Sequence, residues 1–394
     1  MKIITDSQKV KEALTRGVEA VYPSRKELER VLMSGKKIRI YNGIDPTGEL
    51  HIGHIVVLRK LRQFQDLGHE IIVLIGDFTA AIGDPTDKQA ARKPLSREQI
   101  LQNAKNYRKQ IGKFLNTKKS NIRFLYNEEW TNKLKPKDML ELASNFTVAR
   151  LLERDMFQRR IKEGKDIHVH EFLYPIFQAY DSVTMDVDLE IGGNDQTFNM
   201  LAGRMLMKKM KNKEKFVLAT KLLTDPQGKK MGKTEGNLVR LDTDPKDMYG
   251  KIMSWTDEII PLGFELLADL SVEEIEKICK NYRPRDAKAK LAREVVSICH
   301  GEKAARTADK EFSLVFREKK LPTKIPEIKI IKKFINILEL LTMTLVSSKS
   351  EAKRMVLQKG VKIDGEIQTD WRRIIGIKKE MIIQVGKRKF IKII

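Results

Sequence analysis

Residues Lys37–Gly76 have the sequence KIRIYNGIDPTGELHIGHIVVLRKLRQFQDLGHEIIVLIG, and this stretch decides the fold. Residues 37–42 alternate β-branched or aromatic side chains with polar ones, which predicts a strand. After a turn, apolar residues recur at helical spacing from His51 until Gly68, a typical residue just past a helix C-terminus. Glu70–Gly76 is then a nearly continuous apolar run, typical of a strand buried on both faces. Strand, helix and buried strand form a βαβ unit, so we expect an α/β fold with a parallel sheet.

Composition divides the rest of the chain into modules. Residues 1–243 alternate strand and helix patterns, whereas residues 244–320 lack long β runs and favour amphipathic helices. Two prolines and several lysines around residues 321–333 predict a linker. Residues 334–394 then carry thirteen Lys/Arg and only six Asp/Glu. We therefore expect a mixed α/β domain, a helical domain and a small basic α+β domain.

Overall composition excludes several classes of protein. The chain has 394 residues, 41% of them hydrophobic, which is too apolar for a disordered protein. Its longest strongly apolar stretch, Ile71–Ile75, is far shorter than the roughly 20 residues that span a bilayer. The first ten residues lack the apolar run of a signal peptide, and two cysteines provide no disulfide framework. We expect a cytoplasmic protein that does not bind membranes. Its net charge of +23 favours a nucleic-acid partner, although a lysine-rich surface alone could produce it.

The turn and helix start at residues 41–54 carry the strongest chemical signal. This segment follows a strand of a parallel sheet, where open α/β folds usually bind ligands. A helix N-terminus there presents unpaired N–H groups and a positive dipole end to phosphate. His51 and His54 share one helical face, and Gly53 leaves space for a flat base. The alternatives are that the histidines only cap the helix or form half of a zinc site, although no third ligand lies nearby in the sequence.

Two other segments complete the pattern. In Asp225–Asn237, glycines flank a cluster of lysines, which predicts a loop whose positive charges could stabilise a departing pyrophosphate. Such a loop taken alone is usually just exposed to solvent. Tyr174, Gln178 and Asp181 fall on one stripe of a predicted helix whose other residues are apolar. A polar stripe in that setting indicates binding, with an ordinary surface stripe as the alternative. The pair His168 and His170, if it lay on a strand, could hold a metal, but a structural role just before this predicted helix is the favoured interpretation.

Together, His51-Ile-Gly-His54 and Lys230-Met-Gly-Lys233-Thr234 resemble the paired signatures of the class I aminoacyl-tRNA synthetases. The second motif differs from the commoner Lys-Met-Ser-Lys-Ser by a glycine and a threonine. Four further segments are similar to bacterial tyrosyl-tRNA synthetases at matching intervals: residues 41–47, 83–86, 174–181 and 192–196. The resemblance extends from about residue 30 to the C-terminus.

The resemblance implies a role for individual residues. Tyr41 and Asp181 would bind the substrate phenol, and Tyr174, Gln178 and Asp84 its ammonium group. The whole tyrosine-binding set is Tyr41, Asp84, Tyr174, Gln178, Asp181 and Gln196. The ATP-binding set is Gly43, Asp45, Gly53, Gly193, Asp195, Met231 and Lys233. The catalytic set is Thr47, His51, His54, Lys230, Lys233 and Thr234. The tRNA-binding set is Lys88, Arg92, Lys349, Lys353 and Arg354.

The resemblance also implies an architecture and partners. Residues 1–243 would be a Rossmann-like class I catalytic domain with a dimerisation segment around residues 120–180, and residues 244–320 an α-helical anticodon-region domain. Residues 334–394 would form an S4-like RNA-binding domain, with a helix capped by Ser350 and a hairpin turn at Asp364-Gly365. The expected partners are L-tyrosine, ATP with Mg²⁺, tRNA(Tyr) and a second copy of the chain. No tightly bound cofactor and no protein-held metal are expected.

The reaction implied is ligation in two steps, through tyrosyl-adenylate to tyrosyl-tRNA. Three alternatives stay open at this point. A tryptophanyl enzyme shares the class, although Asp181 and the basic C-terminal module argue against it. A small-molecule nucleotidyltransferase could use the same phosphate site but would leave the extension after Asp244 unexplained. An RNA-binding scaffold would not need intact phosphate motifs.

Overall fold

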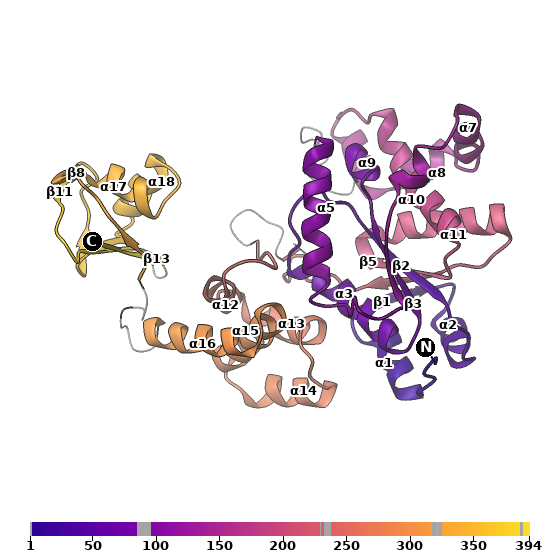
Figure 1. Ribbon diagram of the computed structural model, residues 1–394, viewed down its shortest axis with the longest axis horizontal. Coiled ribbons are helices and arrows are strands. Elements are labelled where there is room, and N and C mark those ends of the chain that lie inside the picture. Colours follow the sequence, from indigo (N-terminus) through magenta and orange to yellow (C-terminus); the bar gives the residue numbers. More distant parts are fainter. Residues whose placement is uncertain are drawn as a thin grey trace. The chain divides into compact units, whose positions relative to one another are not determined.

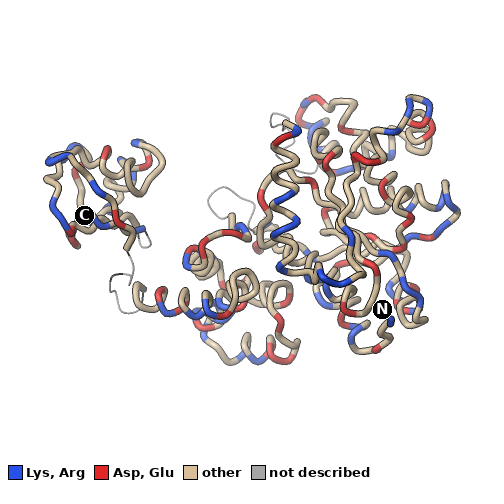
Figure 2. The backbone as a smooth tube through the Cα atoms, in the orientation of Figure 1, with Lys and Arg blue, Asp and Glu red and all other residues tan. Residues whose placement is uncertain are grey.

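The computed structural model describes residues 2–84, 96–228, 230–231, 238–316, 321, 325–386 and 389–394. They form two compact units, Met1–Ala305 and Arg306–Ile394, and the division falls inside α16 (Glu302–Phe316). Figure 1 shows the first unit as a sheet covered by helices and the second as short strands and helices. Lys and Arg occur throughout both units (Figure 2). Within the described residues, no helix is long and apolar enough to cross a membrane.

The first unit is built on a six-stranded sheet in the order β1-β6-β5-β2-β3-β4. Its strands are β1 (Val18–Tyr22), β2 (Arg39–Ile44), β3 (Glu70–Ile75), β4 (Ile122–Tyr126), β5 (Leu189–Gly193) and β6 (Phe216–Thr220). Strands β6, β5, β2, β3 and β4 are mutually parallel. The βαβ prediction is confirmed, because β2 and β3 pair in parallel and α3 (Ile52–Asp66) connects them. The antiparallel edge strand β1 was not predicted.

Helices cover both the sheet and its flanks. Those before residue 244 are α1 (Ser7–Thr15), α2 (Arg25–Met33), α4 (Thr79–Ile82), α5 (Arg97–Ile111), α6 (Glu128–Thr131), α7 (Pro136–Ser144), α8 (Val148–Leu152), α9 (Asp155–Lys162), α10 (Val169–Met185) and α11 (Thr197–Lys211). Those that follow are α12 (Pro245–Met253), α13 (Ile260–Leu267), α14 (Val272–Asn281) and α15 (Pro284–His300). Helical structure after residue 244 agrees with the amphipathic pattern. These helices belong to the same compact unit as the sheet, and the domain boundary at 243/244 stays a prediction.

Two helices set the position of the candidate site. Helix α3 begins after the N-cap His51 and is followed by Gly68, whose φ of +98° lies in the left-handed region that glycine adopts without strain. Helix α10 packs along α11, and its C-terminal residue Met185 packs with Tyr41 of β2 and Leu74 of β3. The N-terminus of α3 and the side of α10 that faces the sheet therefore both lie near the carboxyl ends of the central strands.

The second unit contains two small sheets. Besides the part of α16 that follows Ala305, its helices are α17 (Ile337–Thr344) and α18 (Lys349–Leu357). Its strands are β7 (Glu327–Ile328), β8 (Phe334–Asn336), β9 (Val361–Ile363), β10 (Glu366–Gln368), β11 (Ile374–Gly376), β12 (Ile382–Val385) and β13 (Lys389–Ile393). The predicted hairpin turn is confirmed, since Asp364 and Gly365 both have positive φ between the antiparallel strands β9 and β10. The predicted helix cap was wrong by two residues: Ser348 accepts a hydrogen bond from the Glu351 backbone N–H, and Ser350 lies inside α18.

Candidate active site

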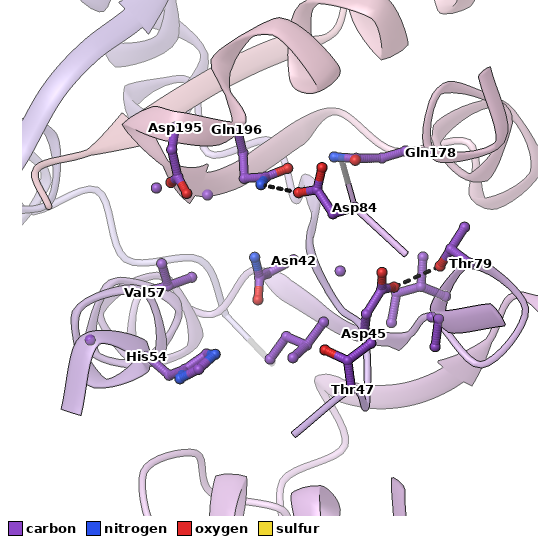
Figure 3. Close-up of a pocket in the computed structure, with 18 of the residues that line it drawn as sticks. Asn42, Asp45, Thr47, His54, Val57, Thr79, Asp84, Gln178, Asp195 and Gln196 are labelled. Carbon is purple, nitrogen blue, oxygen red and sulfur yellow. Dashed lines mark hydrogen bonds between the residues drawn. The ribbon is translucent and has the colours of Figure 1, made fainter. Parts of the chain in front are cut away.

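A cavity of about 660 Å³ opens at the carboxyl ends of β2, β3 and β5. Every predicted tyrosine-binding, ATP-binding and catalytic residue within the described ranges lines this cavity. Figure 3 shows how side chains of the turn after β2 and of α3 lie around the same space as those that follow β5. Lys233, Thr234, Lys88 and Arg92 fall outside the described residues. The predicted tRNA-binding residues Lys349, Lys353 and Arg354 lie on α18 of the second unit.

The two histidines of the first motif cap α3. The Gly53 backbone N–H donates to Nδ1 of His51 at 3.2 Å, and the His51 backbone N–H donates to Nδ1 of His54 at 3.1 Å. The imidazole rings are 4.1 Å apart, between centroids. A Cβ on Gly53 would lie 2.9 Å from Cε1 of His51, so glycine is also needed to seat that ring. Capping and a role in binding are therefore compatible, because both rings line the cavity.

The histidine pairs His51/His54 and His168/His170 were both considered as parts of a metal site. Across the described ranges, no group of three His, Cys, Asp or Glu side chains is arranged to hold a metal ion. His168 and His170 do not lie on a strand, as one hypothesis required, but at the start of α10, with ring centroids 5.7 Å apart. His170 lines the cavity.

The second motif reaches the same cavity. Lys230 forms an ion pair with Asp195, which follows β5. The backbone N–H of Met231 donates to the Leu223 carbonyl at 2.7 Å. On the far side of the motif, the Ile52 N–H donates to the Val239 carbonyl at 3.0 Å. The chain on both sides of residues 232–237 is therefore bonded to segments that border the cavity.

The inner end of the cavity holds a buried carboxyl group, that of Asp181. Asp181 of α10 accepts hydrogen bonds from Nε1 of Trp130 at 2.8 Å and from Nδ2 of Asn127 at 3.2 Å. Burial raises the pKa of Asp181 to about 8, and these two hydrogen bonds oppose the shift. Nearby, the Tyr41 hydroxyl forms a 2.8 Å hydrogen bond with the Ser182 hydroxyl. Tyr41, Asp181 and Ser182 are all buried, so hydroxyl and carboxyl groups lie in the protein interior at this end of the cavity.

A second carboxyl group, half-buried, belongs to Asp45 in the turn between β2 and α3. Asp45 accepts hydrogen bonds from the hydroxyls of Thr79 at 2.6 Å and Tyr174 at 2.8 Å. Burial raises the pKa of Asp45 to about 7 against both hydrogen bonds. Asp84 accepts from Nε2 of Gln196 at 2.6 Å, a contact visible in Figure 3. Carboxylates and carboxamides so arranged can bind a cationic group and hydroxyls.

Several residues around the cavity were missed by sequence reasoning. Trp130 and Asn127 hold Asp181, and Arg154 forms a buried ion pair with Asp84 at 3.4 Å. They come from α6, its N-cap and the residue before α9, which carry no motif. Glu190 also lines the cavity, and a sequence signal for it exists: it is a charged residue within an apolar strand.

Comparisons with known proteins agree with this geometry. The family model for class I tRNA synthetases (W and Y) matches residues 33–317. Tyrosine–tRNA ligases of Carboxydothermus hydrogenoformans and Thermotoga maritima are each 43% identical, covering 97% and 99% of this chain and 97% and 98% of their own. A C-terminally truncated mitochondrial tyrosyl-tRNA synthetase of Coccidioides posadasii is similar in structure, with a TM-score of 0.60 and 26% identity, over 77% of this chain and 90% of that one. The chain therefore belongs to the class I tRNA synthetase family of the tryptophan and tyrosine enzymes.

Proposed function

We propose that the chain is a tyrosine–tRNA ligase, which activates L-tyrosine with ATP and transfers it to tRNA(Tyr). The observation that carries this proposal is the single cavity shared by the start of α3, Lys230 and the Asp181 carboxyl group. A helix N-terminus and an ammonium group suit phosphates, and a buried carboxyl group suits a phenol. The relatives that match over nearly the full chain carry the same activity in their names.

In this proposal, the Asp181 end of the cavity selects the amino acid. The phenol of tyrosine bonds to Asp181 and Tyr41, and its ammonium group to Tyr174, Gln178 and Asp84. Phenylalanine cannot satisfy the buried polar groups at this end. Rejection of an analogue that lacks the hydroxyl is expected on this ground, and tyrosine against phenylalanine is the standard example of the effect.

The first reaction step needs no protein nucleophile. The carboxylate of tyrosine attacks the α-phosphorus of ATP, the bond from that phosphorus to the bridging oxygen breaks, and pyrophosphate leaves. We assign Thr47, His51 and Lys230 to the phosphates, where they position the two anions and stabilise the charge on the leaving group. Asp45, Asp195 and the glycines of the ATP-binding set lie around the nucleotide. Mg²⁺ arrives with ATP as part of the substrate.

The second step transfers the tyrosyl group to RNA. A hydroxyl of the terminal ribose attacks the carbonyl carbon of the adenylate, and AMP leaves. Residues 334–394 are assigned to RNA binding as an S4-like domain, through a basic helix that contacts phosphates. Support comes from Lys349, Lys353 and Arg354 of α18, whose side chains are all exposed. We keep the domain limits 1–243, 244–320 and 334–394 and place the enzyme in the cytoplasm.

A homodimer is part of the proposal. The segment assigned to dimerisation, around residues 120–180, carries large apolar side chains that face solvent in the single chain. Leu140, Val148 and Val169 are 73%, 64% and 78% exposed. Exposed apolar residues grouped in one segment are typical of an interface. A second copy of the chain would cover them.

The decisive experiment is ATP–pyrophosphate exchange measured with each of the twenty amino acids. Tyrosine alone should support rapid exchange. Exchange with tryptophan in its place would identify the other branch of the family. Failure of all twenty would refute an amino-acid-activating enzyme and leave the nucleotidyltransferase or RNA-scaffold alternatives. Charging of tRNA(Tyr) by the tyrosine-activating protein then tests the second step.

A further inference from the structure

A lysine side chain lies completely buried next to the Asp181 end of the cavity. Lys215 precedes β6, and 0% of its side chain is exposed. Its ammonium group donates to Glu190, to the Ser182 hydroxyl at 2.8 Å and to the Met200 carbonyl at 3.2 Å. An ammonium group has three donors, so this one is fully hydrogen-bonded. Lys215 does not line the cavity, whereas Glu190 does.

The surrounding helices leave room for this lysine. A Cβ on Gly203 of α11 would lie 2.4 Å from Nζ of Lys215 and 2.8 Å from Oγ of Ser182. Gly203 has no need of special backbone angles, so the close approach to the lysine is what requires glycine here. A buried ion pair contributes little net stability on average, because desolvation offsets the attraction between the charges. Its position next to the substrate residues points instead to a role in the site.

Glu190 connects the lysine to a substrate-binding residue. One carboxylate oxygen, Oε2, accepts from Lys215, and the other, Oε1, accepts from Nε2 of Gln178 at 3.0 Å. Because the amide nitrogen of Gln178 is engaged by Glu190, its carbonyl oxygen is the atom available to accept a hydrogen bond from the substrate ammonium group. The orientation of this carboxamide therefore depends on Glu190 having two acceptor oxygens.

Lys215 is also linked to a residue at the Asp181 end of the cavity. Ser182 receives the second hydrogen bond of Lys215 and is bonded to the Tyr41 hydroxyl at 2.8 Å. Nζ of Lys215 lies 5.6 Å from the centroid of the Tyr41 ring. One buried cation is thus linked to the residues assigned to both polar ends of tyrosine, through Glu190 on one side and Ser182 on the other.

We propose that Lys215 and Glu190 are positioning residues for tyrosine: the pair fixes the Gln178 carboxamide with its oxygen toward the substrate ammonium group. This inference rests on the proposed function. It assigns a task in substrate recognition to Lys215, which touches no substrate atom.

The test exploits the difference between a carboxylate and a carboxamide. In Glu190→Gln, residue 190 has one acceptor oxygen for two donors, and the charged donor, Lys215, takes it. The remaining NH₂ group then faces Gln178, whose carboxamide must turn its oxygen away from the substrate. The KM for tyrosine in pyrophosphate exchange should rise about tenfold to a hundredfold. The KM for ATP should stay the same.

A double variant separates this positioning role from a merely structural one. In Lys215→Met/Glu190→Gln, the oxygen of residue 190 is released to Gln178 again, and the KM for tyrosine should return to within about threefold of wild type. Inhibition by 3-(4-hydroxyphenyl)propanoate, which lacks the ammonium group, should be equal in all three proteins. Glu214→Gln, which alters the exposed Arg204–Glu214 ion pair next to Lys215 in sequence, is the matched control.

The outcomes distinguish the two proposals. No tyrosine-dependent exchange by the wild-type protein would overturn the proposed function and this inference with it. Exchange by the wild type with an unchanged KM in Glu190→Gln would overturn the inference alone. So would a double variant whose KM is no lower than that of Glu190→Gln, or a loss of inhibition by the deaminated analogue that parallels the change in KM.

Discussion

Asp181 gives the most quantitative prediction. This carboxyl group is 2% exposed, and burial raises its pKa from the ordinary 3.8 to about 8. In the unfolded chain Asp181 releases its proton near pH 4, whereas in the folded protein it keeps it until about pH 8. The folded state therefore binds more protons across this window, and stability falls as the pH rises through it. The change is at most about 6 kcal/mol.

Asp181→Asn removes that titration and disturbs one hydrogen bond. A carboxamide has one acceptor oxygen for the two donors of Trp130 and Asn127, which lowers the free energy of unfolding by about 1–3 kcal/mol at every pH. At pH 4.5 the variant should be less stable than wild type. Between pH 4.5 and pH 9, the free energy of unfolding of the variant should rise by about 5 kcal/mol relative to that of wild type. The variant should therefore be the more stable of the two proteins at pH 9.

Urea unfolding followed by tryptophan fluorescence measures this difference, because Trp130 and Trp255 both lie in the first unit. Asp155→Asn, at an exposed position on α9, gives the effect of losing a surface carboxylate. A stability difference between wild type and Asp181→Asn that is equal at the two pH values would refute the reasoning. Burial would then not govern the protonation of this site.

The remaining predictions concern substrate binding, packing and assembly. Lys230→Ala should slow adenylate formation in single-turnover experiments by at least about tenfold with the Kd for tyrosine unchanged, and a weaker Kd would contradict its assignment to the phosphates. Gly203→Ala should lower the unfolding midpoint in urea and raise the KM for tyrosine, since its methyl group displaces Lys215. A variant with neither change would mean that α11 moves to accommodate the methyl group. Leu140→Glu combined with Val148→Glu should convert a dimer to a monomer in sedimentation experiments, and a dimer that survives both changes would place the interface elsewhere.

Local sequence patterns predicted the parts of the fold that depend on local forces. The run Glu70–Ile75 is apolar at almost every position and forms the buried strand β3, and the capped, periodic segment after His51 forms α3. The pattern of apolar residues over positions 139–159 predicts one helix, but the structure divides this segment among α7, α8 and α9. Thr147 caps α8, so a side-chain hydrogen bond restarts the helix where periodicity alone predicted continuity.

The candidate site was predictable only in part. Motif residues such as His51 and Asp181 could be named because the resemblance assigns them a role in binding or catalysis. The predicted substrate-binding and catalytic residues that the structure describes do line one cavity. Trp130 and Lys215 could not be named, because their roles arise from contacts between distant segments. Lys215 precedes a strand and resembles a surface lysine in sequence, yet the fold buries it against Glu190, 25 residues earlier. Periodicity carries no information about such pairings.

The close approach of Gly203 to Lys215 restricts how the sequence can change during evolution. Since a methyl group at position 203 would meet the tip of the residue at 215, neither site can vary independently toward larger side chains. In descendants of this protein the two positions should change as a pair. A shorter residue at 215 should appear before, or together with, any loss of the glycine, and Glu190 should lose its charge in the same lineages.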